Sequence, residues 1–271
     1  MLESFKHVNS KNEVLDFLQL NIYANENDLR DYQWSYTSNN NKITSFYKGI
    51  VKKSIPFIFY VNEAKAEQIK NQFYEHFDYD VLTQQKGYFE INGYKYYCFA
   101  TKSAKSNYLY SNRELNIKLE VTTDEPFWIK QTTKSINFGV QGESDTLLYT
   151  FAYPFTYTNM NSANILNDNF VQSNAIIRIY GYCINPLVSI NDNIYQVNTT
   201  LESGEYLEID TENKSIFKYS SVGDKTNLFN DRNKSYDVFK PLDNGTLIVG
   251  ANDAFKVDIV LIEKRGEPKW I

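Results

Sequence analysis

The sequence predicts a mainly β protein with one helix, and three observations carry this prediction. The segment Ala175–Pro186, AIIRIYGYCINP, alternates like a strand whose two faces are both largely apolar, so it belongs in or against a core. Aromatic residues make up 16% of the 271 residues, and aromatic side chains are favoured in half-buried sheets. In the second half, several short alternating segments are separated by turn residues, a pattern typical of an antiparallel sandwich.

The strand at Ala175–Pro186 also contains its own boundary signals. Gly181 interrupts the alternation where a bulge or a close backbone approach would sit. Asn185 and Pro186 end the strand, because proline has no N–H to donate to a sheet ladder. The segment contains one charged residue, Arg178, and no chemically reactive group. We therefore expect a structural strand.

The first half is predicted to combine strands with the single helix. Lys48–Val61 is predicted to be a strand with an irregularity at Pro56. Glu63–Phe77 is predicted to be the helix, because its apolar residues recur at helical spacing, and Asn62 can cap its start. The apolar face of this helix comprises Ala66, Ile69, Phe73 and Phe77.

Turn signals place the remaining elements of the first half. Residues 1 to about 50 mix short extended runs with polar turns, one of them at Asn39–Asn41. Asn92-Gly93 lies between two strand-like runs and is the strongest short-range signal for a hairpin. Glu114–Val121 alternates apolar and polar residues, which indicates a half-exposed strand.

The second half is predicted to be almost purely β. Its candidate strands are Thr146–Tyr153, Asn174–Ile184, Val188–Val197, Glu205–Asp210, Ser215–Tyr219, Gly245–Val249 and Ala254–Glu263. The polar stretch Gln131–Gly142 precedes them and contains two glycines, so the domain boundary is expected there. We predict two domains, residues 1–135 and 136–271.

Charge and hydropathy exclude several classes of protein. The formal net charge is −5 and the isoelectric point about 5.2, which argues against a basic face that grips nucleic acid. A mildly acidic protein can still surround DNA without binding it. The sequence contains neither an apolar signal core nor a run of about 18 apolar residues, so we expect no membrane insertion and folding in a cytoplasm.

The cysteines and histidines are too few to suggest a metal or redox centre. Cys98 and Cys183 each lie inside a strand-like run, and we expect buried free thiols rather than a disulfide or ligand pair. Of the two histidines, His76 lies on the predicted helix and is expected at the surface or an interface.

Two acidic or polar clusters could form a site. Glu208, Asp210 and Glu212 could mimic the carboxylate pair of a glycosidase, but their period of two favours one solvated edge beside a turn. Asn191–Asn193 offers oxygen ligands without the calcium-loop pattern, which favours a polar hairpin turn. The sequence lacks the common catalytic and phosphate-binding motifs, so we expect no catalytic residue, no cofactor and no metal site.

Exposed aromatic residues remain as possible binding groups. Trp34, Trp128 and Trp270 could stack on sugar rings, although packing is the commoner use of tryptophan. In the polar loop 224–233, Leu228 and Phe229 could anchor a partner or close the sandwich, and we favour closure.

The order of three motifs along the chain resembles the distal tail protein (Dit) family, the siphovirus tail component of long-tailed phages that infect Gram-positive bacteria. The first is the acidic-Pro-aromatic element EPFW. The second is a strand that ends in Gly-x-x-x-Asn-Pro, and the third is the strand GEYLEID. The resemblance covers nearly the whole chain and is weakest over the first 45 residues. The residues that carry it are Pro126, Phe127, Trp128, Gly181, Asn185, Pro186 and Asp210.

The resemblance implies an N-terminal, β-barrel-like ring-forming domain with one helix and a C-terminal galectin-like β-sandwich. It also implies a homohexameric ring at the phage tail tip. Such a ring joins the tail tube protein to the tail-associated lysin or to baseplate and receptor-binding proteins. The tape measure protein and DNA pass through its channel. A virion protein without catalysis, assembled in the bacterial host cytoplasm, is therefore the first expectation.

Two other classes of function stay open at this point. One is a β-sandwich module that recognises a host cell-wall saccharide through exposed aromatic residues. The other is a hydrolase that uses Glu208 or Asp210, for which the sequence offers no convergent acid, base and electrophile.

Overall fold

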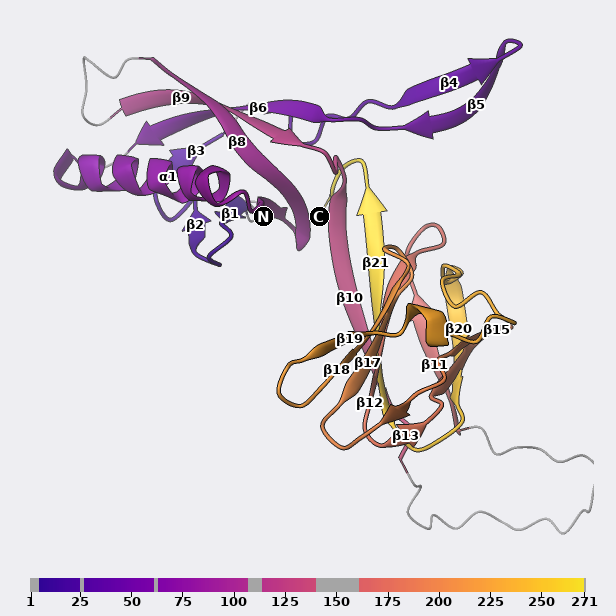
Figure 1. Ribbon diagram of the computed structural model, residues 1–271. Helices are drawn as coiled ribbons and strands as arrows, with labels where there is room; N and C mark the ends of the chain where they lie inside the picture. Colours follow the sequence, from indigo (N-terminus) through magenta and orange to yellow (C-terminus); the bar gives the residue numbers. More distant parts are fainter. Residues whose placement is uncertain (1–4, 25–26, 61–62, 107–113, 140–160, 271) are drawn as a thin grey trace, which may run out of the picture. The chain divides into compact units, whose positions relative to one another are not determined.

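The computed structural model describes residues 5–24, 27–60, 63–106, 114–139 and 161–270 (Figure 1). The chain divides into two compact units. The first unit comprises Met1–Lys130 and Lys264–Ile271, and the second comprises Gln131–Glu263. The expected strand at Thr146–Tyr153 and the expected helix cap at Asn62 lie outside the described residues.

The first unit is an antiparallel sheet with one helix around an aromatic core. Its strands follow the order β3-β6-β9-β8-β7-β1-β2. They are β1 (Phe5–Val8), β2 (Val14–Asp16), β3 (Ile22–Tyr23), β6 (Val51–Tyr60), β7 (Gly87–Ile91), β8 (Tyr94–Ser106) and β9 (Glu114–Thr123). Phenylalanine rings from three elements and from the turn after β2 contact one another in the core, namely Phe57, Phe73, Phe89 and Phe17. Contacts between aromatic rings add to the free energy gained by burying them.

Helix α1 (Glu63–Thr83) confirms the predicted helix and extends it by a turn and a half beyond Phe77. Ala66, Phe73 and Phe77 are buried on one face, as the helical spacing predicts. The helix ends where Gln84 takes a positive φ of 56°, a conformation that cannot continue a right-handed helix.

The predicted hairpin at Asn92-Gly93 is confirmed. These two residues connect β7 to β8 with φ values of 53° and 79°, so both adopt the left-handed conformation of a type I′ turn. The turn matches the twist of the paired strands, which is why Asn-Gly is favoured there.

Pro56 lies inside β6 and causes no irregularity, contrary to the sequence prediction. The pairing of β6 with β9 runs from Val51 to Tyr60 without a register shift. Ser54 directs its N–H and C=O away from β9, toward Asp28. Because these groups alternate along a strand, Pro56 also faces that side, where β9 needs no donor.

The second unit is an antiparallel sandwich, which confirms the fold class predicted for the second half. One sheet has the order β19-β18-β17-β12-β21-β10 and the other β11-β20-β14-β15. The strands are β10 (Trp128–Asn137), β11 (Asn161–Asn167), β12 (Asn174–Tyr180), β14 (Leu187–Ile190), β15 (Asn193–Gln196), β17 (Tyr206–Asp210), β18 (Ser215–Tyr219), β19 (Lys225–Asn227), β20 (Gly245–Ala251) and β21 (Lys256–Arg265). A short pair, β13 (Cys183–Ile184) with β16 (Thr200–Leu201), and the 3-10 turn η1 (Phe229–Asp231) complete it. Inward aliphatic residues of both sheets form one core.

Strand β12 is the central strand that its sequence indicates. Ile177 and Ile179 are fully buried in the sandwich core, while Arg178 and Tyr180 on the opposite face are half-buried. That outer face is covered by its own neighbours, since Tyr180 lies 5.5 Å from Tyr206, measured between ring centroids. The apolar character of both faces therefore reflects a core on one side and a row of aromatic side chains on the other.

The two units divide at the start of the stretch Gln131–Gly142, where the boundary was expected, but the first half of that stretch is part of strand β10 and not a loop. Residues 128–130 of this strand belong to the first unit and residues 131–137 to the second. Thr132 and Thr133 favour extended structure, and Ile136 is buried in the sandwich core. The division between units therefore lies within a strand rather than in a linker.

Both cysteines are buried free thiols, as predicted. Cys98 is in the core of the first unit and Cys183 in that of the second. Burial raises the pKa of the Cys98 thiol and raises that of Cys183 to about 11. Neither thiol is therefore activated as a nucleophile.

Candidate functional site

The most unusual element of the first unit is a hairpin arm formed by β4 (Ser35–Asn39) and β5 (Lys42–Tyr47). Among the described strands, these two pair only with each other, and they extend away from the sheet and helix of the unit (Figure 1). Asn40 and Asn41 form the turn, with φ values of 47° and 60°. Every residue of both strands is exposed to solvent.

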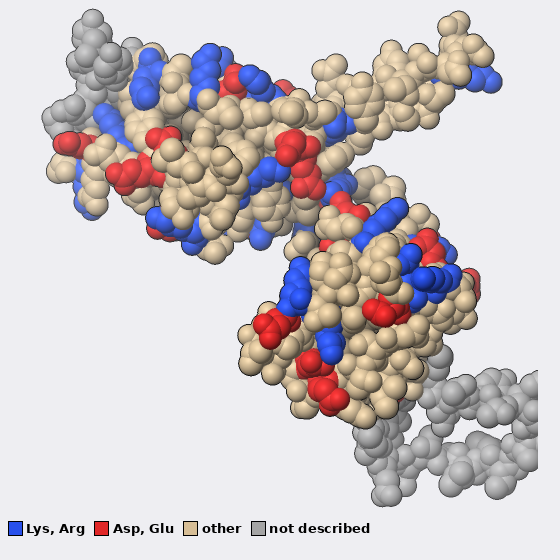
Figure 2. Space-filling view, in the orientation of Figure 1, with Lys and Arg blue, Asp and Glu red and all other residues tan. Residues whose placement is uncertain are grey.

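The arm is almost uncharged and carries exposed apolar side chains. Lys42, next to the turn, is the one charged residue between Ser35 and Tyr47, and Figure 2 shows the arm as a largely uncharged surface. Exposed fractions reach 58% for Tyr36 and 61% for Phe46. A two-stranded hairpin is marginally stable alone in water, and apolar patches of this kind mark interaction sites.

The root of the arm is held by a buried lysine and a buried tryptophan. The Lys53 ammonium donates to the carbonyl oxygens of Asp28, Leu29 and Asp31, in the segment that leads into the arm. The Trp128 indole N–H donates to the Leu29 carbonyl at 3.1 Å. Burial lowers the pKa of Lys53 to about 8. These bonds fix the loop backbone before β4.

The return segment of the arm is fixed by a second cation. The Lys48 ammonium lies 5.3 Å from the ring centre of Tyr32, 4.7 Å from that of Trp34 and 4.8 Å from that of Phe127. It also donates to the carbonyl oxygen of Pro126 at 3.2 Å. Burial lowers the pKa of Lys48. Cation–π contacts of this kind hold the segments before β4 and after β5 against the segment Pro126–Phe127.

The C-terminal segment returns to this root. The Arg30 guanidinium lies 3.7 Å from the ring centre of Trp270 and donates to the Pro268 carbonyl at 2.9 Å. Asn92 donates to the carbonyl of Lys269 at 3.1 Å. Residues 264–270, placed in the second domain by the sequence analysis, therefore cluster with the first unit.

The three family-motif residues of the first half thus meet at one place. Pro126 supplies a carbonyl, Phe127 a ring and Trp128 an indole N–H to the root of the arm. The arrangement holds an exposed hairpin on a rigid base. Such a base suits an element that contacts another molecule, because little further ordering is needed at the attachment point.

The family-motif residues of the second half shape turns. Gly181 has a φ of 103° and follows the last residue of β12. No atom of the described residues lies within 4 Å of the position that its Cβ would occupy, so the glycine serves a turn rather than a close approach. Asn185 has a φ of 51° and donates its N–H to Thr199 at 2.7 Å, while the Pro186 carbonyl accepts from Val197 at 3.3 Å.

Asp210 is buried rather than solvated, which corrects the sequence prediction. Its carboxylate accepts from the backbone N–H groups of Glu212 and Asn213 and from the Asn213 side chain, at 2.7–3.0 Å. Glu208 instead forms an ion pair with Arg178 at 2.8 Å. In the ladder between β17 and β12, Asp210 is paired with Ile176, near the start of β12, whereas Gly181 follows the other end of that strand. The two carboxylates therefore stabilise a turn and a sheet face.

His76 is buried, contrary to the surface position expected for it. The side chain of His76 is 5% exposed, and its Nε2 atom lies 2.9 Å from the Nδ1 atom of His7. Helical spacing alone could not predict this burial. The polar ring of His76 is paired with His7 on β1, which is far away in the sequence. Burial and the second ring lower the pKa of His7 well below its usual value.

The remaining aromatic candidates divide between packing and exposure. Trp128 is fully buried, whereas Trp34 and Trp270 are 41% and 69% exposed. Leu228 is buried in the sandwich core, so it closes the sandwich as expected, while Phe229 stacks on Phe239 at its rim.

The part of the chain that is described contains neither a membrane-spanning helix nor a cluster of metal-ligating side chains. No helix there is long and apolar enough to span a bilayer. No three histidine, cysteine, aspartate or glutamate side chains in the same ranges converge to hold a metal ion.

The fold is shared with phage hub and baseplate proteins. At 11% sequence identity the chain is similar to SPP1 Dit (gp 19.1), described as a paradigm of the hub adsorption apparatus in phages that infect Gram-positive bacteria. That match has a TM-score of 0.59 and covers 96% of this chain and 99% of the other. Two structures of the activated phage P2 baseplate, with Ca and with Sr, match at TM-scores of 0.57 and 0.58, each at 11% identity, with 99% of this chain and 100% of the other covered. No protein-family model and no curated protein matches the sequence.

Sequence reasoning missed the cations at the root of the arm, namely Arg30, Lys48 and Lys53. Arg30 and Lys48 lie in polar stretches, where no local pattern distinguishes them from surface residues. Lys53 follows Lys52 and shares the inward face of its strand with Ile55, Phe57 and Phe59, so strand alternation is the signal that could have located it. The polar turn at Asn39–Asn41 was recognised, and it was the available signal for the arm.

Proposed function

We propose that this protein is a structural component of a phage tail tip, a distal tail protein that assembles as a homohexameric ring. The ring joins the tail tube protein to tail-associated lysin or baseplate proteins, and it lets the tape measure protein and DNA pass. The protein acts in the virion, after assembly in the host cytoplasm, and it has no catalytic activity. The shared fold over nearly the whole chain supports this role.

The observation that carries the proposal is the exposed arm on its rigid root. Tyr36, Ile43 and Phe46 remain in water in the single chain, at a cost that contact with another copy removes. A head-to-tail contact between identical copies closes into a ring when its rotation allows. The net charge of −5 fits a ring that does not retain DNA.

The test compares assembly of the wild-type protein with that of the double variant Tyr36→Lys/Phe46→Lys. Light scattering and negative-stain microscopy are recorded over a range of concentrations, with and without tail tube protein. We expect closed rings from the wild type and monomers from the double variant, with the same melting temperature, because both side chains are exposed.

Val222→Lys is the matched control, since Val222 is 83% exposed in the second unit and lies outside the arm. It is expected to assemble like the wild type. A wild type that stays monomeric at high concentration and with tail tube protein contradicts the hub function. If the double variant forms rings, only the role of the arm in assembly is contradicted, and the hub function is not.

A further inference from the structure

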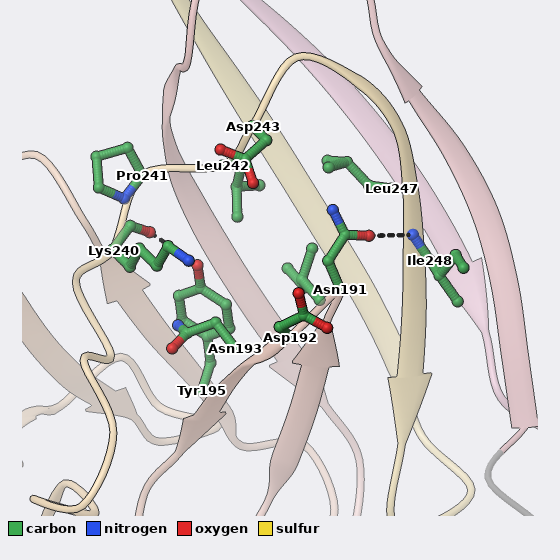
Figure 3. A pocket seen from close by; sticks show the side chains of 11 residues that line it. Asn191, Asp192, Asn193, Tyr195, Lys240, Pro241, Leu242, Asp243, Leu247 and Ile248 are labelled. Atoms are coloured by element: carbon green, nitrogen blue, oxygen red, sulfur yellow. Dashed lines mark hydrogen bonds between the residues drawn. The ribbon is translucent and has the colours of Figure 1, made fainter.

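A pocket of about 370 Å³ lies in the second unit, at one end of the sheet β11-β20-β14-β15. Figure 3 shows its walls, formed by the turn between β14 and β15, the loop Lys240–Asp243 and the first half of β20. The turn contains Asn191 and Asp192, the polar cluster that the sequence analysis interpreted as a hairpin turn. The volume of the pocket is at the lower end of the range for small-molecule sites.

The walls of the pocket are fixed by hydrogen bonds. Asn191 exchanges bonds with Ile248, its N–H donating to the Ile248 carbonyl and its Oδ1 accepting the Ile248 N–H, both at 2.9 Å. The Tyr195 hydroxyl donates to the carbonyl of Lys240 at 2.7 Å. Asn167 donates to the carbonyl of Asp243 at 2.8 Å. The turn and the loop are therefore held in place before any ligand arrives, which lowers the entropy cost of binding.

Three charged side chains point to the pocket with hydrogen-bonding capacity in reserve. Within the described residues, no hydrogen bond or ion pair involves the Asp192 carboxylate or the Lys240 ammonium. Asp243 uses Oδ1 to accept from Gln172, and no bond to its Oδ2 is found in the same ranges. The pocket thus offers carboxylate acceptors and an ammonium donor together.

This combination selects against ions and for hydroxyl groups. An anionic ligand would satisfy Lys240 but face two carboxylates, and a cationic ligand would satisfy the carboxylates but face Lys240. A hydroxyl group is both donor and acceptor, so neighbouring hydroxyls can bind a carboxylate and the ammonium at once. The exposed side chain of Ile248 offers an apolar wall for C–H groups.

We propose that this pocket binds a saccharide unit, a binding activity that goes beyond the structural role in the tail tip. Asp192 and Asp243 accept from sugar hydroxyls, Lys240 donates to them, and Ile248 contacts the carbon face of the ring. Among the described residues that line the pocket, the one aromatic side chain, Tyr195, is buried and cannot stack on the sugar, so single-site affinity is about millimolar.

The test is saturation-transfer difference NMR on the full-length protein, with methyl glycosides of glucose, galactose, N-acetylglucosamine and N-acetylmannosamine as probes. This method detects weak binding to a protomer or to a larger assembly, so its outcome does not depend on ring formation. We expect saturable transfer from at least one glycoside. In Asp192→Ala and in Lys240→Ala the affinity is expected to fall about tenfold each, because each loses a hydrogen bond to a charged group.

Asp224→Ala and Lys234→Ala are the matched controls, since both residues are exposed in the same unit but lie outside the pocket. They are expected to bind like the wild type. The absence of transfer from every glycoside overturns the proposal, as does transfer that survives in both pocket variants. Binding of a lysine-containing peptide that Asp192→Ala abolishes and Lys240→Ala strengthens would assign the pocket to a basic protein segment instead.

Discussion

His7 and His76 are the only histidines of the chain, and they form one buried pair that ties β1 to α1. Burial is the main cause that lowers the pKa of both rings, to about 4 for His76. The neighbouring Glu13 raises the pKa of His76 but does not offset the burial. A ring that stays neutral in the folded protein and takes up a proton when unfolded makes stability depend on pH.

The first prediction is a loss of stability on acidification from pH 6.5 to about 4. In this window the unfolded histidines bind protons that the folded ones do not, so the free energy of unfolding falls as the pH falls. The shift of His76 from 6.5 to about 4 corresponds to about 3 kcal/mol. Urea unfolding at several pH values measures it, and His76→Gln, which keeps a polar side chain without titrating, is expected to have a smaller slope. If the free energy of unfolding depends on pH equally steeply in the wild type and in His76→Gln, the pH dependence does not come from His76.

The elements of the first unit differ sharply in how they are supported. Strand β6 lies in the sheet between β9 and β3, whereas β4 and β5 have no strand partner but each other within the described ranges. The arm is therefore fixed at its root, through Lys48 and Lys53, and not along its length. Local opening is easiest where few apolar contacts cover the backbone hydrogen bonds.

Hydrogen exchange measured by mass spectrometry tests this contrast between elements. In the monomer, amides of residues 35–47 are expected to exchange much faster than those of residues 51–60, because the arm buries no apolar surface against the sheet. In the assembled ring the arm is expected to become protected. Protection of the arm in the monomer equal to that of β6 would show that the arm is stabilised within the single chain.

At the scale of the whole molecule, the C-terminus stabilises the first unit after the chain has completed the second. Strand β21 ends at Arg265, and the residues after it contact Arg30 and Asn92. The first unit is thus formed from both ends of the chain. Such closure makes its stability depend on residues that a truncation at the sandwich would remove.

The third prediction concerns a chain truncated after Arg265. Loss of the bonds to Pro268 and Lys269 and of the Arg30–Trp270 contact is expected to destabilise the first unit by about 2 kcal/mol and lower its melting temperature by about 6 °C. Differential scanning calorimetry with limited proteolysis can assign the change to one unit. Trp270→Leu is the milder variant, with about a quarter of the effect. Equal destabilisation of residues 161–263 would contradict the prediction that the residues after Arg265 stabilise the first unit in particular.

Local patterns predicted much of the fold because their physical causes are local. Helical spacing located α1, the Asn-Gly pair located the hairpin between β7 and β8, and alternation located β12, β17 and β18. Each of these elements depends on residues a few positions apart, so it can be located without knowing the rest of the fold. The mainly β class and the sandwich follow from the same signals.

The candidate sites, in contrast, depend on contacts between residues that are far apart in the sequence. Arg30 and Pro268 are 238 positions apart, and His7 and His76 are 69 apart, so no local pattern relates them. The same is true of the pocket, which combines a hairpin turn with the loop at Lys240–Asp243. Side chains like these acquire their roles through burial and through partners supplied by the folded chain, and a sequence pattern contains neither.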